Sequence, residues 1–279
     1  MKTAGFCWGV KRALSMISEA AAHTKGPLYS IGPVIHNPQT VERLRSELGM
    51  KVIDSINDIT GGTVVVRTHG VGPAVVEEAR SKGLEVLDAT CPFVSKIQEY
   101  ARMLTREGYN LIIIGERNHP EVSGIIAHAG GKVRVIENAE DVKSLGNYKR
   151  AGVVVQSTQE EESVRDIVAA LLPKVGELRL FNTICNATLS RQSETRQLAR
   201  EVELMVVVGG RNSGNTRRLV DICKQTGVKT IHIEDGSELD QVWLDGVERI
   251  GITAGASTPD SVLAAVIKSI KEASDRAGS

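Results

Sequence analysis

The sequence predicts an α/β fold built from three similar units, each with a parallel sheet. Two observations carry this prediction. Short β-branched runs alternate with segments of helical periodicity along all 279 residues. The same spacing of a cysteine, a strand-end glycine and a polar residue also recurs three times. We therefore expect units at residues 1–90, 91–184 and 185–279, in a pseudo-threefold arrangement.

Ten apolar runs of strand length predict the strands, and most are continuous, as in strands buried on both faces. They are residues 28–31, 64–66, 85–87, 111–114, 133–136, 153–155, 178–181, 205–208, 230–233 and 250–253. Apolar residues at helical spacing follow Cys7 and Cys91, and Gly108 ends the second of these predicted helices. Proline is tolerated at the first helical position, and five prolines stand where a helix would begin. They are Pro38, Pro73, Pro92, Pro120 and Pro259.

The repeat becomes visible when the sequence is shifted by 94 positions, which places Cys91 on Cys185, Gly115 on Gly209 and His119 on Ser213. The first unit follows the same order with a one-residue slip. Its corresponding residues are Cys7, Gly32 and His36. A further strand in each unit ends in small polar residues, namely Thr68-His69-Gly70, Ser157-Thr158-Gln159 and Gly255-Ala256-Ser257-Thr258.

Composition excludes several classes of partner. Lys and Arg number 34, as do Asp and Glu, and aromatic residues make up only 3%, so we expect no nucleic-acid binding. No apolar run approaches the roughly 20 residues of a membrane span, and no signal peptide precedes Cys7. We therefore expect a cytoplasmic protein without membrane contact. Four cysteines are too few for a disulfide framework and are more typical of metal binding, catalysis or packing.

The repeated polar residues fall where strands turn into helices. Backbone N–H groups and the positive end of the helix dipole favour anions there, so these turns suit a phosphate-bearing ligand. No Walker loop or full dinucleotide motif is present. Glu121 is the only carboxylate at the repeated positions and could supply a proton. The candidate ligand-binding residues are His36, His69, His119, Ser213, Asn215 and Ser257.

Three cysteines, Cys7, Cys91 and Cys185, also stand immediately before predicted helices, where the helix N-terminus stabilises a thiolate. If the units pack around a threefold axis, the three thiolates converge and select zinc or an iron–sulfur cluster, leaving one coordination position open. Cys223 lies outside this register and is expected to be a packing residue. A phosphate-ligand binding protein with structural zinc, or a metal-free α/β enzyme, remain alternatives at this point.

Motifs along nearly the whole chain resemble the LytB/IspH family of 4-hydroxy-3-methylbut-2-enyl diphosphate reductases. The matching segments are Gly5-Phe6-Cys7-Trp8-Gly9-Val10, Ile35-His36-Asn37, Thr68-His69-Gly70, Asp88-Ala89-Thr90-Cys91-Pro92, His119-Pro120-Glu121-Val122, Asn212-Ser213-Gly214-Asn215-Thr216 and Thr253-Ala254-Gly255-Ala256-Ser257. The resemblance implies an oxidoreductase of the final step of the methylerythritol phosphate (non-mevalonate) route to isoprenoids. Its products would be isopentenyl diphosphate and dimethylallyl diphosphate.

The resemblance also implies roles for individual residues. Cys7, Cys91 and Cys185 would hold one [4Fe-4S] cluster with an open iron site, at the centre of the three units. Glu121 would deliver protons, and His119 would lie close enough to the diphosphate to assist. The side chains of His36, His69, Ser213, Asn215 and Ser257, with the backbone at Gly214, would hold the diphosphate. Ser157, where threonine is common, or its neighbour Thr158 would lie near the substrate hydroxyl. A ferredoxin or flavodoxin would supply electrons.

Overall fold

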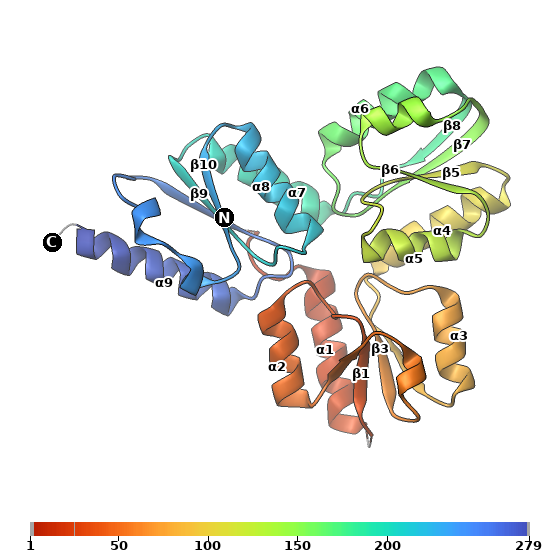
Figure 1. Cartoon of the computed structure of the whole chain (residues 1–279), viewed down its shortest axis with the longest axis horizontal. Helices are drawn as coiled ribbons and strands as arrows, with labels where there is room; N and C mark the ends of the chain where they lie inside the picture. Colours follow the sequence, from red (N-terminus) through yellow and green to blue (C-terminus); the bar gives the residue numbers. More distant parts are fainter. Residues whose placement is uncertain (1–2, 25, 278–279) are drawn as a thin grey trace. The chain divides into compact units, whose positions relative to one another are not determined.

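The computed structural model describes residues 3–24 and 26–277, and its strands form three separate parallel sheets (Figure 1). The chain divides into two compact units. The larger unit comprises Gly9–Ile35 and Val41–Cys185 and contains two of the sheets. The smaller unit comprises Met1–Trp8, His36–Thr40 and Asn186–Ser279 and contains the third.

All three sheets are built in the same way. The first strand lies inside the sheet, the second pairs with one side of it and the third with the other. The first sheet has the order β2-β1-β3-β4, from β1 (Leu28–Ile31), β2 (Lys51–Ile53), β3 (Thr63–Val66) and β4 (Glu85–Asp88). The second has the order β6-β5-β7-β8, from β5 (Asn110–Ile114), β6 (Val133–Ile136), β7 (Tyr148–Val155) and β8 (Val175–Phe181). The third has the order β10-β9-β11, from β9 (Leu204–Val208), β10 (Lys229–Ile233) and β11 (Ile250–Ala254).

Helices connect the strands and cover the sheets. They are α1 (Trp8–His23), α2 (Pro38–Leu48), α3 (Pro73–Ser81), α4 (Pro92–Arg106), α5 (Pro120–Ala129), α6 (Glu161–Leu171), α7 (Asn186–Ala199), α8 (Gly214–Gln225) and α9 (Asp260–Ala277). In Figure 1, α4 and α5 lie on one face of the second sheet and α6 on the other. This parallel α/β architecture in three sheets is the fold class that the sequence predicts.

Two details of the predicted elements were wrong. The sequence predicts ten strands and misses β2, because Lys51 and Val52 are exposed at the edge of the first sheet and form no buried apolar run. Helix α9 begins at Asp260, one residue after Pro259. The other four prolines, Pro38, Pro73, Pro92 and Pro120, are each the first residue of a helix.

The central strand of the third sheet shows why continuous apolar runs mark these sheets. Alternate residues of β9 face opposite sides: Leu204 and Val208 pack in one core with α9, while Met205 packs in the other with α8. Cys223 of α8 is fully buried in the second of these cores, and burial raises the pKa of its thiol to about 12. Cys223 is therefore a packing residue, as the sequence predicts.

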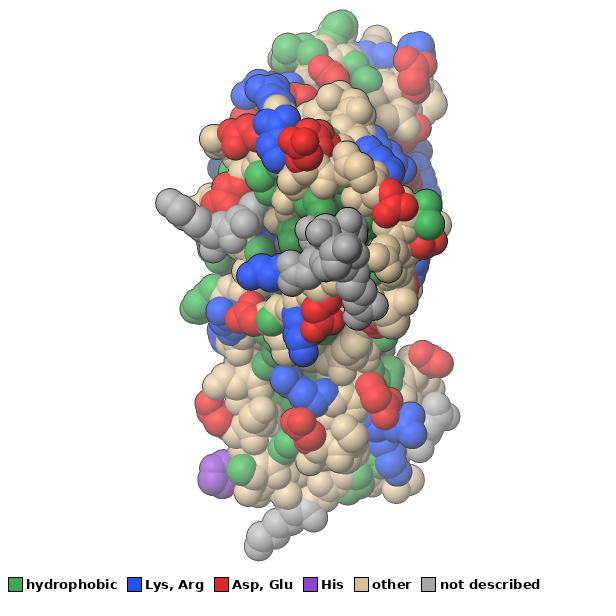
Figure 2. Space-filling view, turned by 90° about the vertical axis from the view of Figure 1, so that its left-hand side faces the viewer, with side chains coloured by type: hydrophobic (Ala, Val, Ile, Leu, Met, Phe, Trp, Pro, Cys, Tyr) green, Lys and Arg blue, Asp and Glu red, His purple; other side chains and the backbone are tan. Residues whose placement is uncertain are grey.

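The surface agrees with the balanced composition. Figure 2 shows positive and negative side chains interspersed over one face, with no extended area of a single sign. Among the described residues, no helix has both the length and the apolar character needed to span a bilayer.

Candidate functional site

Equivalent hydrogen bonds place the three predicted repeats in register. In each sheet, the glycine that follows the central strand donates its N–H to the last carbonyl of the neighbouring strand. The pairs are Gly32 to Ile53 at 2.8 Å, Gly115 to Ile136 at 3.0 Å and Gly209 to Ile233 at 2.9 Å. The turns that follow these glycines are therefore structurally equivalent, and they carry the candidate ligand-binding residues.

The three cysteines of the repeat also occupy equivalent positions. Each is half-buried and stands directly before a helix, Cys7 before α1, Cys91 before α4 and Cys185 before α7. Each backbone N–H donates a 3.0 Å hydrogen bond to a carbonyl in the turn that ends the third strand of a sheet. Cys91 bonds to Thr68, Cys185 to Ser157 and Cys7 to Ala256. The three thiols thus stand at equivalent helix N-termini.

The capping residues correct the sequence register in the first unit. His119 caps α5 and Ser213 caps α8 through their side chains. The equivalent helix α2 is capped by Asn37, whose Oδ1 accepts the Thr40 N–H at 2.8 Å. Helix α2 begins six residues after Gly32, whereas α5 and α8 begin five residues after their glycines. Because the first turn is one residue longer, Asn37 and not His36 is the counterpart of His119.

In the smaller unit, the segment that carries His36 packs against the turns after β9 and β11. A Cβ atom added to Gly210 would lie only 2.4 Å from the carbonyl oxygen of His36. The Ser257 hydroxyl donates to that same oxygen at 3.3 Å. Three predicted ligand-binding positions therefore lie together in this unit. They are His36, Ser257 and the turn that carries Gly210 and Ser213.

Asn215 lies on the first turn of α8 in the same unit and is 3% exposed. Within the described part of the chain, neither its amide oxygen nor its amide nitrogen has a hydrogen-bond partner. A buried amide left in this state costs about 1–3 kcal/mol. An anion bound at the helix N-terminus, beside Gly214 and Ser213, would accept a hydrogen bond from the amide nitrogen.

In the larger unit, two histidines meet at the turns after β3 and β5. The rings of His69 and His119 have centroids 5.5 Å apart and are nearly perpendicular, at 86°. Gly124 of α5 lets the backbone of His69 lie close to this helix, because a Cβ there would lie 3.3 Å from the carbonyl oxygen of His69. Nδ1 of His119 accepts the Glu121 N–H at 3.1 Å, so the proton of the neutral ring is on Nε2.

Glu121 is the second residue of α5 and is 2% exposed. Its two oxygens accept hydrogen bonds from Ser157, Oε1 from the backbone N–H at 2.6 Å and Oε2 from the hydroxyl at 2.7 Å. Burial raises the pKa of Glu121, and this effect outweighs the opposing effect of the Ser157 hydrogen bonds. The side chain can therefore keep a proton at a higher pH than an exposed glutamate.

Sequence reasoning missed Gln156, which organises this part of the site. Its fully buried amide accepts the Glu116 N–H at 2.8 Å and donates to Thr158 Oγ1 at 3.0 Å. Gly115 leaves room for it, since a Cβ there would lie 2.8 Å from Gln156 Oε1. Gln156 therefore engages the Thr158 hydroxyl, while Ser157 contacts Glu121. Its position directly before Ser157, at the start of a repeated polar turn, is the signal that could have identified it.

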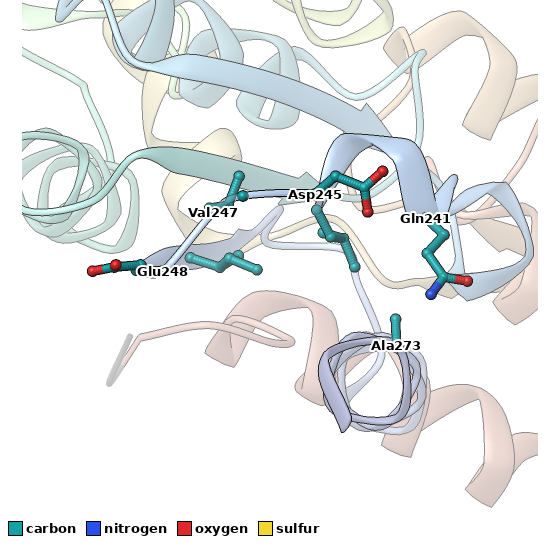
Figure 3. Close-up of a pocket in the computed structure, with 8 residues that line it drawn as sticks. Gln241, Asp245, Val247, Glu248 and Ala273 are labelled. Carbon is teal, nitrogen blue, oxygen red and sulfur yellow. The ribbon is translucent and has the colours of Figure 1, made fainter. Parts of the chain in front are cut away.

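A separate pocket lies near the beginning of β11 and contains none of the predicted site residues. It is lined by residues of the segment before β11 and by Ala273 of α9, including Gln241, Asp245 and Val247 (Figure 3). Because Ser257 follows the other end of β11, this pocket lies at the opposite edge of the third sheet from the repeated polar turns.

Comparison with known proteins identifies the family. Residues 1–271 match the family model of the LytB protein. The 4-hydroxy-3-methylbut-2-enyl diphosphate reductase of Geobacter sulfurreducens is 49% identical over 97% of this chain and 95% of its own length. The protein of the same name from Pelobacter propionicus is 45% identical over 97% and 96%.

Solved structures agree with this assignment. One, of (E)-4-hydroxy-3-methyl-but-2-enyl diphosphate reductase, the terminal enzyme of the non-mevalonate pathway, is 43% identical, covers 97% of both chains and has a TM-score of 0.70. Another, of E-1-hydroxy-2-methyl-but-2-enyl-4-diphosphate reductase from Plasmodium falciparum, is 31% identical, covers 95% of this chain and 85% of that one, and has a TM-score of 0.89. The chain therefore belongs to the LytB family.

Proposed function

We propose that the chain reduces 4-hydroxy-3-methylbut-2-enyl diphosphate to isopentenyl diphosphate and dimethylallyl diphosphate, as the last step of non-mevalonate isoprenoid synthesis. The reaction consumes two electrons and two protons, breaks the allylic C–O bond, forms a C–H bond and releases water. One observation in the structure carries the proposal. Ser157 holds the buried acid Glu121 with its N–H and hydroxyl, and its carbonyl receives the N–H of Cys185.

Cys7, Cys91 and Cys185 would hold one [4Fe-4S] cluster. Three thiols at helix N-termini, with matching backbone anchors, are a suitable set of soft donors for such a group. When bound, the cluster would supply electrons and a Lewis-acidic iron without a protein ligand. The cytoplasm would keep these thiols reduced, and a ferredoxin or flavodoxin would deliver the electrons.

The diphosphate would be held by neutral donors at helix starts. His36, His69, Ser213, Asn215, Ser257 and the backbone of Gly214 would provide them. The buried amide of Asn215 supports this role, because a phosphate oxygen would accept from its nitrogen. Helix dipoles add to the attraction, so the site needs no cluster of Lys or Arg.

Glu121 would act as the proton source for the departing hydroxyl. Burial raises the pKa of Glu121, which favours its protonated form. With a proton on Oε2, the hydrogen bond to Ser157 reverses, so that Oε2–H donates to Oγ and the Ser157 hydroxyl turns to donate its own hydrogen to the leaving oxygen. The proton can then pass along this pair. His119, which caps the same helix through Nδ1, presents its Nε2 proton for a hydrogen bond to the diphosphate.

The repeat gives this site its organisation. We propose that residues 1–90, 91–184 and 185–279 are three copies of one α/β unit around a pseudo-threefold axis. Their matching turns support the proposal, because each copy contributes a strand-end glycine and a cysteine with the same backbone bond.

Anaerobically purified protein tests the function directly. We expect a brown protein whose visible absorbance bleaches on reduction and which consumes hydroxymethylbutenyl diphosphate with a chemical reductant and mediator. Cys91→Ser should lose the iron, whereas Cys223→Ala, the control in a buried packing position, should keep it. A colourless protein with stoichiometric zinc and no turnover would refute the proposal and favour a phosphate-binding protein.

A further inference from the structure

Two arginines bond to the backbone of the loops that carry proposed cluster ligands. Arg191 lies on α7, the helix that follows Cys185, and it is 3% exposed. Arg12 lies on α1, the helix that follows Cys7, and it is half-buried. The Arg191 guanidinium donates to a carbonyl in the loop before Cys7, and the Arg12 guanidinium donates to a carbonyl in the loop before Cys91.

Arg191 holds the loop before Cys7. Its Nη2 donates to the carbonyl of Gly5 at 2.5 Å, and its Nη1 donates to the carbonyl of Ala187 at 3.4 Å. Gly5 stands two residues before Cys7, and Ala187 two residues after Cys185. One rigid guanidinium fork therefore connects backbone next to two of the three cysteines.

Among its described residues, the loop before Cys7 has no Asx turn, whereas the other two loops each have one. Asp88, three residues before Cys91, accepts the Thr90 N–H at 2.9 Å through its Oδ1 atom. Three residues before Cys185, Asn182 accepts the Ile184 N–H at 3.3 Å. These are Asx turns, which fix a loop from within. The residue three before Cys7 is Ala4, which has no such side chain. Two side chains of α7 hold this loop from outside: Arg191 donates to the Gly5 carbonyl, and Glu194 accepts from the N–H and hydroxyl of Thr3 at 3.3 and 3.0 Å.

Arg12 makes the corresponding connection to the second cysteine. Its Nη1 donates to the carbonyl of Thr90 at 3.2 Å, one residue before Cys91. Asp88 accepts the N–H of Thr90, and Arg12 donates to the carbonyl of the same residue. The two side chains therefore fix both backbone polar groups of Thr90.

We infer that Arg191 and Arg12 are positioning residues, which fix the Cys7 and Cys91 loops so that their thiols can bind the cluster without further ordering. Arg191 acts on the Cys7 loop from the helix that follows Cys185, and Arg12 acts on the Cys91 loop from the helix that follows Cys7. The inference rests on the proposed function for the identity of the bound group. The mobility of the loops themselves can be measured without that group.

Hydrogen exchange of the iron-free protein measures that mobility. We expect Arg191→Met to speed amide exchange in peptides covering residues 3–10 by at least about tenfold, because a buried charge-assisted hydrogen bond is lost. Arg12→Met should speed exchange in residues 88–93 by a smaller factor, about threefold, because its hydrogen bond is only partly buried and the Asp88 turn remains. Arg200→Met and Lys11→Met are matched controls, since both side chains are exposed, and they should leave exchange unchanged. Unchanged exchange in both Arg191→Met and Arg12→Met would overturn the inference.

The reconstituted protein gives a second measurement. With an iron chelator present, Arg191→Met should lose visible absorbance at least about tenfold faster than wild type, and the electron paramagnetic resonance of its reduced form should change. Arg191→Lys keeps the charge and one donor and should restore part of the loss, a rescue that general unfolding would not show. Wild-type retention rates in Arg191→Met and Arg12→Met would refute the positioning role. Wild-type protein that binds no iron would instead refute the proposed function, and the exchange data would still decide the role of the arginines.

Discussion

Replacing Glu121 with glutamine separates proton delivery from every other role of this side chain. The glutamine amide has the same shape, so its oxygen can accept the Ser157 N–H while its nitrogen donates to the Ser157 hydroxyl oxygen. Packing and both hydrogen-bonded contacts with Ser157 therefore persist. Glu121→Gln removes only the exchangeable carboxyl proton.

The expected effects follow from the burial of the carboxyl group. Loss of a positioned general acid lowers turnover by about 100- to 10,000-fold, while KM should stay within about threefold because the proposed diphosphate contacts remain. Stability should change in a pH-dependent way. Burial raises the pKa of Glu121, so the stabilisation that this group contributes is complete below the ordinary carboxyl pKa and is lost as the pH rises through the raised value.

For each unit by which folding raises this pKa, the free energy of unfolding falls by about 1.4 kcal/mol at high pH. For a chain of this size, 1 kcal/mol shifts the melting temperature by about 2–4 °C. The glutamine of Glu121→Gln cannot ionise. The melting temperature of this variant should therefore rise relative to that of wild type as the pH increases from 5 to 8.

Steady-state turnover and thermal melts at pH 5 to 8 measure these two effects. Glu77→Gln is the control, since Glu77 is an exposed carboxylate on α3, and this variant should keep wild-type turnover and the wild-type pH dependence of melting. Near-normal turnover in Glu121→Gln would refute the proton-delivery role. A pH dependence of melting equal to that of wild type would refute the effect of burial on this carboxyl group.

Two further predictions concern binding and packing. Asn215→Ala should raise the dissociation constant for inorganic diphosphate about 10-fold, measured by calorimetry, without lowering the melting temperature, because the buried amide has no described partner to lose; a large drop in melting temperature would contradict this. Gly115→Ala should destabilise the protein by about 1–3 kcal/mol in urea unfolding, because its Cβ would lie 2.8 Å from Gln156, and an unchanged unfolding midpoint would show that Gln156 can move aside.

The sequence could predict the fold and the repeat because both depend on local patterns. Buried strands in parallel sheets read as continuous apolar runs, as Leu204–Val208 does. Strand β2 was not predicted because a short, exposed edge strand produces no such run. The equivalence of Gly115 and Gly209 was visible as a constant spacing, and their matching backbone bonds confirm it.

Features of the site that depend on contacts distant in sequence could not be predicted. Nothing near Glu121 in the sequence indicates that Ser157 would donate both of its hydrogen bonds, since 36 residues separate them. The first-unit counterpart of His119 was misplaced by one residue, at His36 and not Asn37, because counting from Gly32 cannot reveal a turn that is one residue longer. The hydrogen bond from the Thr40 N–H to Asn37 Oδ1 shows which residue caps the helix.

The hydrogen bond from Cys7 to Ala256 explains how a linear chain gives three sheets one cysteine each. The turn after β3 receives the N–H of Cys91, and the turn after β7 receives that of Cys185, so each sheet is paired with the cysteine that follows it in the sequence. The turn after β11 is paired instead with Cys7, which precedes all three sheets in the sequence. Cys7 therefore belongs structurally to the third sheet. Its loop enters from the N-terminal segment, and two side chains of α7 hold it: Arg191 at the Gly5 carbonyl and Glu194 at Thr3.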